Sequence, residues 1–557
     1  MNNLNRRSFL KRSAAVGLAA GAALPAEAQA RRSAVEAKPK NRAPRPRDET
    51  RPNILFIIVD QLRHHRWFPD QAQIDAWLPN IARIRKQATS FENHYTASNM
   101  CTAARGTLLT GLYSHQTGVM LTLTETSSTL SPLFPTWGTM LRQQGYRTSW
   151  YGKWHLAVEA DSANGTLEPY GFDGGTFPSP NGNPQQGLSM DPVIAGQFLG
   201  WLDDAGADGP WATAVSFVNP HDINWWPNDT NVDQKTADQE VNWNFGAGSP
   251  NVETLEQLEA RKPRLQSAYY QTLDLVCGPQ ELYNTDGTSS WDKMLNLYVW
   301  YQQHVDVQIG RVLDALYARP KIAANTIVIF TSDHGEYGGS HGLRAKGGGV
   351  YEEGIHVPLY VVDPYRRLSN GRYQARQQFT SSVDITPLLL TLAHGSSGWR
   401  ADSRYAHIAR RYDLAAIAEH PRTAGRPYIA HATDETAMEQ ASYEYTAFSQ
   451  AAAHHINSVR TRQGKYAVYS NWATGTDTVE TANQEFELYD YSTWDGVMEV
   501  DNLAGQGSQF ESQLSDLLNH EVIPNELNQP LPAYLREAQE EGYADFYKLM
   551  SNPENTA

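Results

Sequence analysis

The residues best suited to chemistry in this chain lie in a few short runs. Cys101, one of only two cysteines in 557 residues, is followed by Arg105, and Asp60 ends an early apolar segment. A Gly-Lys-x-His cluster and a Ser-Asp-His-Gly-Glu cluster come later in the chain. A thiol near cations, carboxylates and imidazoles suits nucleophilic catalysis. We therefore predict that Cys101 is the precursor of the reactive group.

Two aspartates are candidate metal ligands. Asp60 and Asp333 follow apolar segments and offer hard oxygen ligands, with Gln61 and His334 beside them to complete the shell. A single Asp after a strand is more often a helix cap or a loop residue, but two of them beside the other clusters favour a metal site. A mainly oxygen site suits Ca²⁺, Mg²⁺ or Mn²⁺.

Three cations could surround one anion. Arg105 offers a planar fork, whereas Lys153 and Lys346 offer compact charges, although any single lysine could be an ordinary surface cation. His155 and His221 are candidate proton-transfer groups. A lone histidine is more often a structural hydrogen-bonding residue, and His221 is favoured because it follows a predicted strand and a proline.

These residues need a scaffold that brings strand ends together. Residues 53–59 (NILFIIV) are apolar on both faces, which is typical of a central strand in a parallel sheet. In such sheets catalytic groups gather beyond the carboxyl ends of the strands, where Asp60 would lie. Alternating strands and helices predict an α/β fold with a large, mostly parallel sheet flanked by helices. The predicted strands are 53–59, 148–151, 211–218 and 326–330, and the predicted helices are 78–88, 104–112 (after a loop that carries Cys101), 137–144 and 295–316.

Two later regions differ from this pattern. Residues 222–290 show little regular periodicity, so we expect a long irregular substrate loop. Trp225, Trp226, Trp67 and Phe68 could line an aryl or sugar pocket or could pack in the core. A smaller α+β subdomain with an antiparallel sheet is expected after residue 400. Its predicted strands are 428–432, 447–450, 456–462, 466–469 and 485–491, and its predicted helices are 509–519 and 533–550.

The N-terminal segment has the pattern of a targeting signal. Residues 1–30 contain a twin-arginine run (NRRSFLK, 5–11), a weakly apolar stretch and a small-x-small cleavage site at 28–30. The stretch is too short to span a bilayer, so we predict a cleaved signal and a periplasmic or secreted protein, although a membrane anchor or a disordered basic tail would also fit. Residues 31–51 are predicted to be a disordered linker.

Charge and cysteine content exclude several classes of protein. The net charge is -15, and cleavage after residue 30 would remove four basic and one acidic residue, leaving -15 - 3 = -18. Such an acidic protein should not bind nucleic acid or anionic membranes through its overall field, so an anionic substrate needs a local positive pocket. With Cys101 and Cys277 alone, a disulfide scaffold is excluded. We expect no nucleic-acid partner and no stable membrane span after cleavage.

Residues 52–504 resemble a type I sulfatase, the formylglycine-dependent class in the alkaline phosphatase superfamily. Residues 101–105 (CTAAR) resemble the signature C-x-[PA]-x-R, and residues 145–155 resemble G-Y-x-T-x-x-x-G-K-x-H. The resemblance to the family's metal and lysine region lies in residues 332–336, 341–342, 346 and 351–358. The resemblance to the family's C-terminal subdomain lies in residues 487–490 and 502–504. We therefore predict a sulfatase catalytic α/β domain over 52–400 and a C-terminal subdomain with a helical tail over 401–557.

The resemblance implies an exported sulfatase that converts an organic sulfate ester, of a small molecule or a saccharide, to an alcohol and sulfate. Cys101 would be converted to 3-oxoalanine (formylglycine) by formylglycine-generating enzyme, before the twin-arginine translocase exports the folded protein. One divalent cation is implied, Ca²⁺ first, with Mn²⁺ and Mg²⁺ as alternatives. The implied metal ligands are Asp60, Gln61, Cys101, Asp333 and His334, and the implied catalytic residues are Cys101, Arg105, Lys153, His155, His221 and Lys346.

The resemblance also implies a role for each catalytic residue. A hydroxyl of the hydrated formylglycine would attack sulfur, Arg105 would orient the diol, and two lysines, Lys153 and Lys346, would stabilise the sulfuryl oxygens. His221 or Lys346 would assist the departing alkoxide. His155 would then remove the proton of the remaining hydroxyl, so that sulfate is released.

The chain departs from the commonest family pattern at a few positions. Gln61 and His334 stand where many sulfatases have Asp and Asn, a variation familiar from choline-sulfatase-like and phosphonate-monoesterase-like members. Ala103 and Ala104 replace the commoner Pro and Ser of the signature. The alternatives are therefore a phosphonate monoester or phosphodiester hydrolase of the same superfamily, and a non-enzymatic binding protein with a degenerate site.

Overall fold

The computed structural model describes residues 51–122, 129–228, 231–246, 248–278, 290–434, 452–453, 455–473, 476 and 478–550. The predicted signal peptide, the predicted linker up to residue 50 and the predicted strand at 447–450 lie outside the described residues. A search of the described part of the chain finds no helix with the length and hydropathy of a membrane span.

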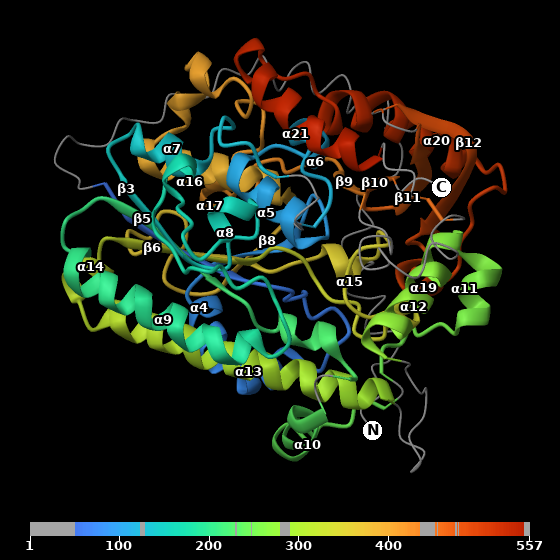
Figure 1. Ribbon diagram of the computed structural model, residues 1–557, viewed down its shortest axis with the longest axis horizontal. Coiled ribbons are helices and arrows are strands. Elements are labelled where there is room, and N and C mark those ends of the chain that lie inside the picture. The colour runs from blue at the N-terminus through green and yellow to red at the C-terminus, as the bar shows by residue number, and fades with distance from the viewer. Residues whose placement is uncertain are drawn as a thin grey trace.

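An eight-stranded sheet forms the centre of the larger part of the molecule (Figure 1). Strand β1 (Asn53–Val59) has the predicted bounds and pairs in parallel with β5 (Trp211–Phe217) and β6 (Thr326–Ser332). Strand β3 (Arg147–Gly152) continues the parallel order beyond β5. The carboxyl ends of β3, β5, β1 and β6 therefore lie side by side, and the prediction of a large, mostly parallel sheet is confirmed.

The two edges of this sheet complete the order β4-β3-β5-β1-β6-β7-β2-β8. The short β4 (Asp173–Gly174) pairs in parallel with β3. Strand β7 (Leu359–Val362) runs antiparallel to both of its neighbours, β6 and β2 (Thr89–Tyr95). The last strand, β8 (Gln374–Ser381), pairs in parallel with β2. A single reversed strand thus makes the sheet mixed.

Helices cover both faces of the sheet because its central strands are apolar on both sides. Ile54, Phe56 and Ile58 of β1 point into one buried cluster, and the alternate residues Leu55 and Ile57 point into another. In Figure 1, α9 and α13 lie together on one side of the sheet and α5, α7 and α16 on the other. The helices are α3 (Gln71–Trp77), α4 (Pro79–Arg85), α5 (Cys101–Thr110), α6 (Ser114–Thr117), α7 (Trp137–Arg142), α8 (Val158–Asp161), α9 (Gln186–Ala205), α13 (Ser290–Tyr317), α14 (Pro320–Ala323), α15 (Glu352–Ile355), α16 (Ile385–His394) and α17 (Leu414–Glu419).

A second, four-stranded antiparallel sheet follows, as predicted. Its order is β12-β11-β10-β9, and helix α20 packs beside it (Figure 1). The C-terminal helix α21 reaches back to α6, where the Tyr543 hydroxyl donates to the His115 carbonyl oxygen over 2.6 Å. The elements are β9 (Ile429–Thr433), β10 (His455–Arg460), β11 (Gly464–Trp472), β12 (Val479–Asp490), α19 (Trp494–Val497), α20 (Gln509–Leu517), a π-helix (Leu518–Leu527) and α21 (Arg536–Met550).

Two expectations about local structure are wrong. Cys101 is the first residue of helix α5, so it does not stand in a loop before a helix that begins at residue 104. The region 222–290 is not irregular, because it contains α10 (Asn231–Glu240), α11 (Leu255–Arg261) and α12 (Arg264–Cys277). Thr254 caps α11 through a capping box with Gln257, and apolar residues of α12 recur at helical spacing.

Candidate active site

The predicted site residues converge at the carboxyl ends of the central strands. Asp60 directly follows β1 and Asp333 directly follows β6, and these two strands pair with Val59 opposite Ser332. Lys153 follows β3, which pairs with β5 so that Gly152 stands opposite Ser216. The strand register therefore brings two carboxylates and one ammonium together from segments far apart in sequence.

The thiol of Cys101 lies among these groups. Its Sγ is 3.1 Å from His334 Nε2, 3.8 Å from Lys153 Nζ and 4.0 Å from Asp60 Oδ1. Burial and the Asp60 charge act to raise the pKa of the thiol, but Lys153, Lys346 and His334 outweigh them and lower it. The side chain is thus held in a site that favours its anionic form.

Arg105, one turn further along α5, lies between the two aspartates. Its NH2 nitrogen is 3.0 Å from Asp60 Oδ2 and 3.0 Å from Asp333 Oδ2. Its NH1 nitrogen donates to the Lys153 carbonyl oxygen over 2.8 Å and to Ser216 Oγ over 2.9 Å. Burial acts to lower the pKa of Arg105, but the two carboxylates raise it overall. The guanidinium therefore stays charged and connects α5, β1, β3, β5 and β6.

Lys153 follows a turn in which only glycine fits at position 152. Gly152 has a φ of 99°, and a Cβ there would lie 1.9 Å from the Ser216 carbonyl oxygen. The turn directs Lys153 Nζ to 2.7 Å from Asp60 Oδ2. Burial acts to lower the pKa of Lys153, but Asp60 and the Cys101 thiolate raise it. Lys153 is therefore a buried cation beside the Cys101 thiol.

Lys346 reaches the site beside Gln61. Its Nζ donates to Gln61 Oε1 over 2.6 Å and lies 3.4 Å from Asn224 Oδ1. The other end of the Gln61 amide donates through Nε2 to Glu336 Oε2 over 2.5 Å. Glu336 also accepts the backbone N–H groups of Gly338 and Ala345, so it closes the loop that ends at Lys346.

The two candidate proton-transfer histidines are buried and uncharged. Burial is the largest cause that places the pKa of His155 and of His221 well below its ordinary value, and the charges of Lys153 and Lys346 lower both further. Within the described residues, the Nδ1 atom of each ring has no hydrogen-bond partner. The structure therefore leaves one ring nitrogen of each free for a substrate or a proton.

Local backbone geometry directs both rings. His155 has a φ of 59°, and its N–H donates to Asp161 Oδ1 over 3.1 Å. His221 begins the 3₁₀ turn η2 (His221–Trp225) and faces Gly182, where a Cβ would lie 2.4 Å from the ring. Only a residue without a side chain fits beside His221 without moving it.

The donor set fits a divalent cation. Ligand atoms of Asp60, Cys101, Asp333 and His334 all lie within 4.8 Å of one another, and the four side chains are buried. The carboxylates of Asp60 and Asp333 are hard oxygen ligands of the kind that Ca²⁺, Mn²⁺ and Mg²⁺ prefer, and His334 adds one imidazole nitrogen beside them. Gln61 adjoins this group, but its amide oxygen faces Lys346.

Sequence reasoning missed three polar residues of the site. Glu336 orients Gln61, Asn224 lies beside Lys346, and Ser216 holds Arg105. Glu336 ends the Ser-Asp-His-Gly-Glu run, and Asn224 stands three residues after His221. Their closeness to these motifs in the sequence could have indicated that both belong to the site. Ser216 carried no such signal, because it lies inside a strand.

Three of the four aromatic residues considered for a substrate pocket pack in the core. Trp67, Phe68 and Trp226 are buried in the cluster on the α9 and α13 side of the sheet. Trp225 is half-buried, and its Nε1 donates to the Gly182 carbonyl oxygen over 2.8 Å. Of this set, Trp225 alone adjoins the glycine that faces His221.

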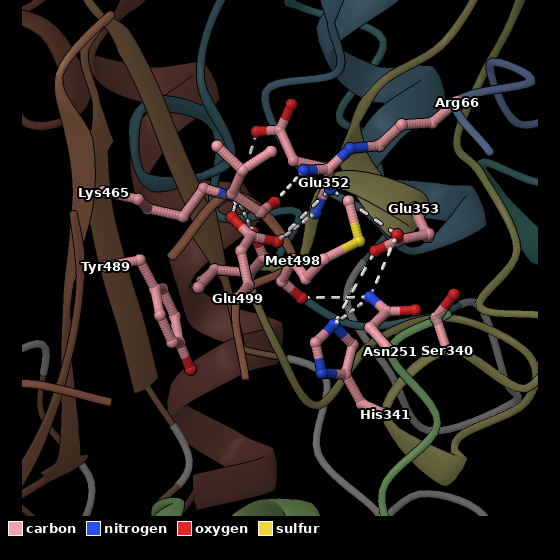
Figure 2. Close-up of polar contacts among 12 residues, drawn as sticks. Arg66, Asn251, Ser340, His341, Glu352, Glu353, Lys465, Tyr489, Met498 and Glu499 are labelled. Atoms are coloured by element: carbon pink, nitrogen blue, oxygen red, sulfur yellow. Dashed lines mark hydrogen bonds and ion pairs between the residues drawn. The ribbon is translucent and has the colours of Figure 1, made fainter. Parts of the chain in front are cut away.

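A buried network of charges anchors the loop that carries Lys346. In Figure 2, His341 points toward Asn251 and Glu353, and Asn251 also reaches the Met498 carbonyl oxygen at 3.1 Å. The other ring nitrogen of His341 lies 2.7 Å from Glu253 Oε2. The loop is thus fixed to the C-terminal part of the chain five residues before Lys346.

Fold and site place a buried thiol, two carboxylates and cations at the carboxyl ends of a parallel sheet, which fits an ester hydrolase of the alkaline phosphatase superfamily. A sequence profile of the Sulfatase family matches residues 52–396. The chain therefore belongs to the sulfatase family, and it is a sulfuric ester hydrolase.

The chain is similar in sequence to known sulfatases and in fold to solved structures. The uncharacterized sulfatase YidJ of Escherichia coli (strain K12) is 28% identical over 374 residues, which cover 62% of this chain and 68% of the relative. The solved structure of a 2-O GAG sulfatase has a TM-score of 0.63 at 20% identity and covers 89% of this chain and 94% of its own. The phosphonate monoester hydrolase of Silicibacter pomeroyi has a TM-score of 0.62 at 20% identity, with 87% and 97% covered.

Proposed function

We propose that this chain is an exported sulfatase that cleaves an organic sulfate ester to an alcohol and inorganic sulfate, with Cys101 converted to formylglycine. The observation that carries the proposal is the surroundings of Cys101, whose Sγ lies 3.8 Å from Lys153 Nζ and 4.0 Å from Asp60 Oδ1. A nucleophile between an ammonium and a carboxylate cluster can be activated on one side and can meet an anionic group on the other.

Two groups that are implied by the family would complete the site. Formylglycine supplies, as its hydrate, one hydroxyl for attack on sulfur and a second whose ionisation releases sulfate. A divalent cation, Ca²⁺ first and Mn²⁺ or Mg²⁺ as alternatives, supplies a Lewis acid. Asp60, Asp333 and His334 would hold this cation together with the side chain at position 101. The predicted ligand Gln61 lies beside them, but its amide oxygen accepts from Lys346.

The cationic side chains would bind the sulfate group. Lys153 lies beside Cys101 and Lys346 beside Gln61, so their ammonium groups are suited to the sulfuryl oxygens and to the charge that grows there. Arg105 already contacts Asp60 and Asp333, so it would hold the carboxylates and the diol in place. The binding of an anion in this buried place is favoured because three cations compensate it.

The histidines would move the protons. Neutral in the free protein, His155 can accept the proton of the remaining hydroxyl, which is the task of a general base. The bound sulfate raises the pKa of His221 by its negative charge, so that the ring can donate to the leaving oxygen together with Lys346.

A second candidate function is hydrolysis of phosphonate monoesters or phosphodiesters. The Gln61 and His334 variation supports it, together with the likeness to the fold of a phosphonate monoester hydrolase. Sulfate and phosphonate esters share a tetrahedral anionic centre, so the same cations would bind either. The sulfatase profile favours the sulfate ester as the preferred substrate.

Parallel kinetics and a peptide mass test the proposal. Full-length protein is made with a formylglycine-generating enzyme, and kcat/KM is measured with an aryl sulfate and an aryl phosphonate monoester. The mass of the tryptic peptide that contains Cys101 is measured on the same sample. We expect conversion of Cys101, preference for the sulfate and loss of turnover in Cys101→Ala. Preference for the phosphonate favours the second candidate, and a Cys101→Ala variant as active as wild type refutes the mechanism.

Export and domain organisation are part of the same proposal. We infer that residues 1–30 direct folded protein to the periplasm or beyond through the twin-arginine translocase, after modification of Cys101 in the cytosol. Residues 52–400 would form the catalytic domain and residues 401–557 the C-terminal subdomain. Replacing the arginine pair at positions 6 and 7 by lysines should retain the protein in the cytosol, which fractionation measures.

A further inference from the structure

A second cluster of metal-ligating side chains lies far in sequence from the active-site carboxylates. His115 belongs to α6, Asp434 directly follows β9, and His455 begins β10. Their ligand atoms all lie within 4.8 Å of one another, and none of the three residues is more than 3% exposed. The antiparallel register, with Ile456 opposite Thr433, places Asp434 beside His455.

Each of these side chains has one hydrogen bond to an outer residue. His115 Nδ1 lies 3.0 Å from Asn528 Oδ1, and His455 Nε2 lies 2.8 Å from Asn457 Nδ2. Trp472 Nε1 donates to Asp434 Oδ1 over 2.7 Å. Outer partners of this kind fix the orientation of metal-binding histidines and carboxylates. The arrangement directs His115 Nε2, His455 Nδ1 and the Asp434 carboxylate toward one another.

The protein satisfies the inner atoms of the cluster only in part, since His455 Nδ1 lies 2.8 Å from Asp434 Oδ1. Among the residues that the structure describes, His115 Nε2, Asp434 Oδ2 and Asn457 Oδ1 have no hydrogen-bond partner. His115 Nδ1 already has a partner in Asn528 Oδ1, and its Nε2 lies 3.5 Å from Asp434 Oδ2. A cation between these two buried atoms would satisfy both of them.

The charge of the cluster is also uncompensated. Within the described part of the chain, no lysine or arginine forms an ion pair with Asp434. A buried carboxylate without a cationic side chain beside it would be stabilised by a bound metal ion.

A third group of acidic and imidazole side chains differs from this cluster because cationic side chains contact it. His341, Glu353 and Glu499 also lie close together, but Figure 2 shows Arg66 and Lys465 directed into that group. Arg66 lies 3.5 Å from Glu353, and Lys465 Nζ lies 2.6 Å from Glu499 Oε1. The carboxylates there already have cationic partners, so their negative charge is compensated without a metal ion.

We propose that His115, Asp434 and His455 bind a divalent transition metal ion with the chemistry of Zn²⁺. Two imidazole nitrogens and one carboxylate oxygen favour such an ion over Ca²⁺ or Mg²⁺, which take oxygen ligands. On binding, the ring proton of His455 moves from Nδ1 to Nε2 and the Asn457 amide turns over, so that Asn457 Oδ1 accepts the Nε2 proton and His455 Nδ1 binds the metal. No proton, electron or bond of the sulfatase reaction is involved.

The metal would join separate parts of the fold. It would fasten α6 to β9 and β10, and α6 follows closely after α5, the helix that begins with Cys101. Apolar side chains of Met120, Leu121, Trp472 and Phe546 form a cluster at this junction, and Trp472 also belongs to the outer hydrogen bonds. A dry, oriented site of this kind suits a structural metal.

Metal content and a cobalt spectrum test the proposal. Untagged full-length protein is stripped with a nitrogen-donor chelator, and Zn²⁺ or Co²⁺ is returned in the presence of excess Ca²⁺ to occupy hard oxygen sites. We expect tight binding of about one equivalent of Zn²⁺, visible d–d bands with Co²⁺, and a higher Tm with the metal bound. His115→Gln and Asp434→Asn should lose the equivalent and the bands, and Asn528→Ala should weaken binding roughly 10- to 100-fold.

Two controls make every outcome decisive. His431→Gln removes another buried imidazole of β9 and should retain the metal, whereas Asp333→Asn alters the active-site cluster and should also retain it. If wild-type protein takes up no Zn²⁺ and gives no cobalt bands, the proposal is wrong. It is also wrong if His115→Gln and Asp434→Asn, folded by circular dichroism, bind Zn²⁺ as wild type does.

Discussion

The Lys346 ammonium lies 2.6 Å from the Gln61 amide oxygen, beyond the carboxyl end of the central strand β1. An ammonium can only donate a hydrogen bond, so this contact fixes the amide with its oxygen toward Lys346 and its nitrogen toward Glu336. The same glutamate accepts the N–H of Ala345, the residue before Lys346. Glu336 therefore positions both partners of the contact, although it lies behind them.

Replacing Glu336 should disturb the site without removing any group that would touch the substrate. In Glu336→Gln one acceptor becomes a donor, so Gln61 Nε2 or a loop N–H loses its partner, at a cost of about 1–3 kcal/mol. We expect kcat/KM to fall roughly 10- to 100-fold, as measured by steady-state kinetics with an aryl sulfate. Glu487→Gln, which alters a buried carboxylate bonded to Tyr351 and Tyr469, should leave kcat/KM near wild type.

Arg105 should be essential for stability as well as for activity. Without it, Asp60 and Asp333 would be left as buried carboxylates with fewer cationic partners, since Arg105 contacts both at 3.0 Å. Breaking a buried ion pair in this way typically costs about 3–5 kcal/mol. Urea unfolding of Arg105→Met with divalent ions chelated should show a loss of that size. A loss under about 1 kcal/mol would mean that the guanidinium does not neutralise the pair.

The glycine beside His221 offers a test of how that ring is positioned. A Cβ at Gly182 would lie 2.4 Å from the ring, and the φ of 102° is also unfavourable for alanine. We expect Gly182→Ala to displace His221 and lower kcat at least ~10-fold, with a smaller change in KM. Gly196→Ala in α9, where nothing lies within 4 Å, is the matched control and should keep wild-type kinetics. Equal kcat values for the two variants would exclude a positioned role for His221.

The strands that carry the site could be predicted from sequence because they are buried on both faces. Residues 53–59 form one continuous apolar run, and the structure gives the strand the same bounds. Asp60, Lys153 and Asp333 could then be placed at strand ends, since parallel strands align their carboxyl ends. Local sequence patterns were therefore sufficient to predict a strand that is buried along its whole length.

Other features could not be predicted because no local pattern records them. The start of α5 at Cys101 has no capping side chain, since its N-cap residue is Met100, so the sequence carried no helix-start signal there. The contact of Gln61 with Glu336 joins residues 275 positions apart.

The helix α12 was predictable in principle, because Leu265, Ala268 and Leu273 recur at helical spacing, but polar neighbours obscured it.

Stability should fall with acid because several histidines are buried in their neutral form. His94 lies in β2 with no exposure, and its Nδ1 lies 2.9 Å from Thr380 Oγ1. Burial, aided by the charges of His356 and Arg426, lowers the pKa of His94 to about 3, although Asp384 acts in the opposite direction. The unfolded chain would protonate this ring near its ordinary value of about 6.5.

The sign of the effect follows from proton binding. Between about pH 6.5 and pH 3 the unfolded state holds a proton at His94 that the folded state lacks, so the free energy of unfolding falls as pH falls, by about 1.4 kcal/mol per pH unit from this group. His94→Gln should therefore make the dependence of that free energy on pH shallower by about this amount between pH 6 and 4.5, in urea unfolding at several pH values. The exposed His520, changed to Gln, is the control and should leave the slope as in wild type. An unchanged slope in His94→Gln would show that His94 takes up its proton in the folded protein as readily as in the unfolded chain.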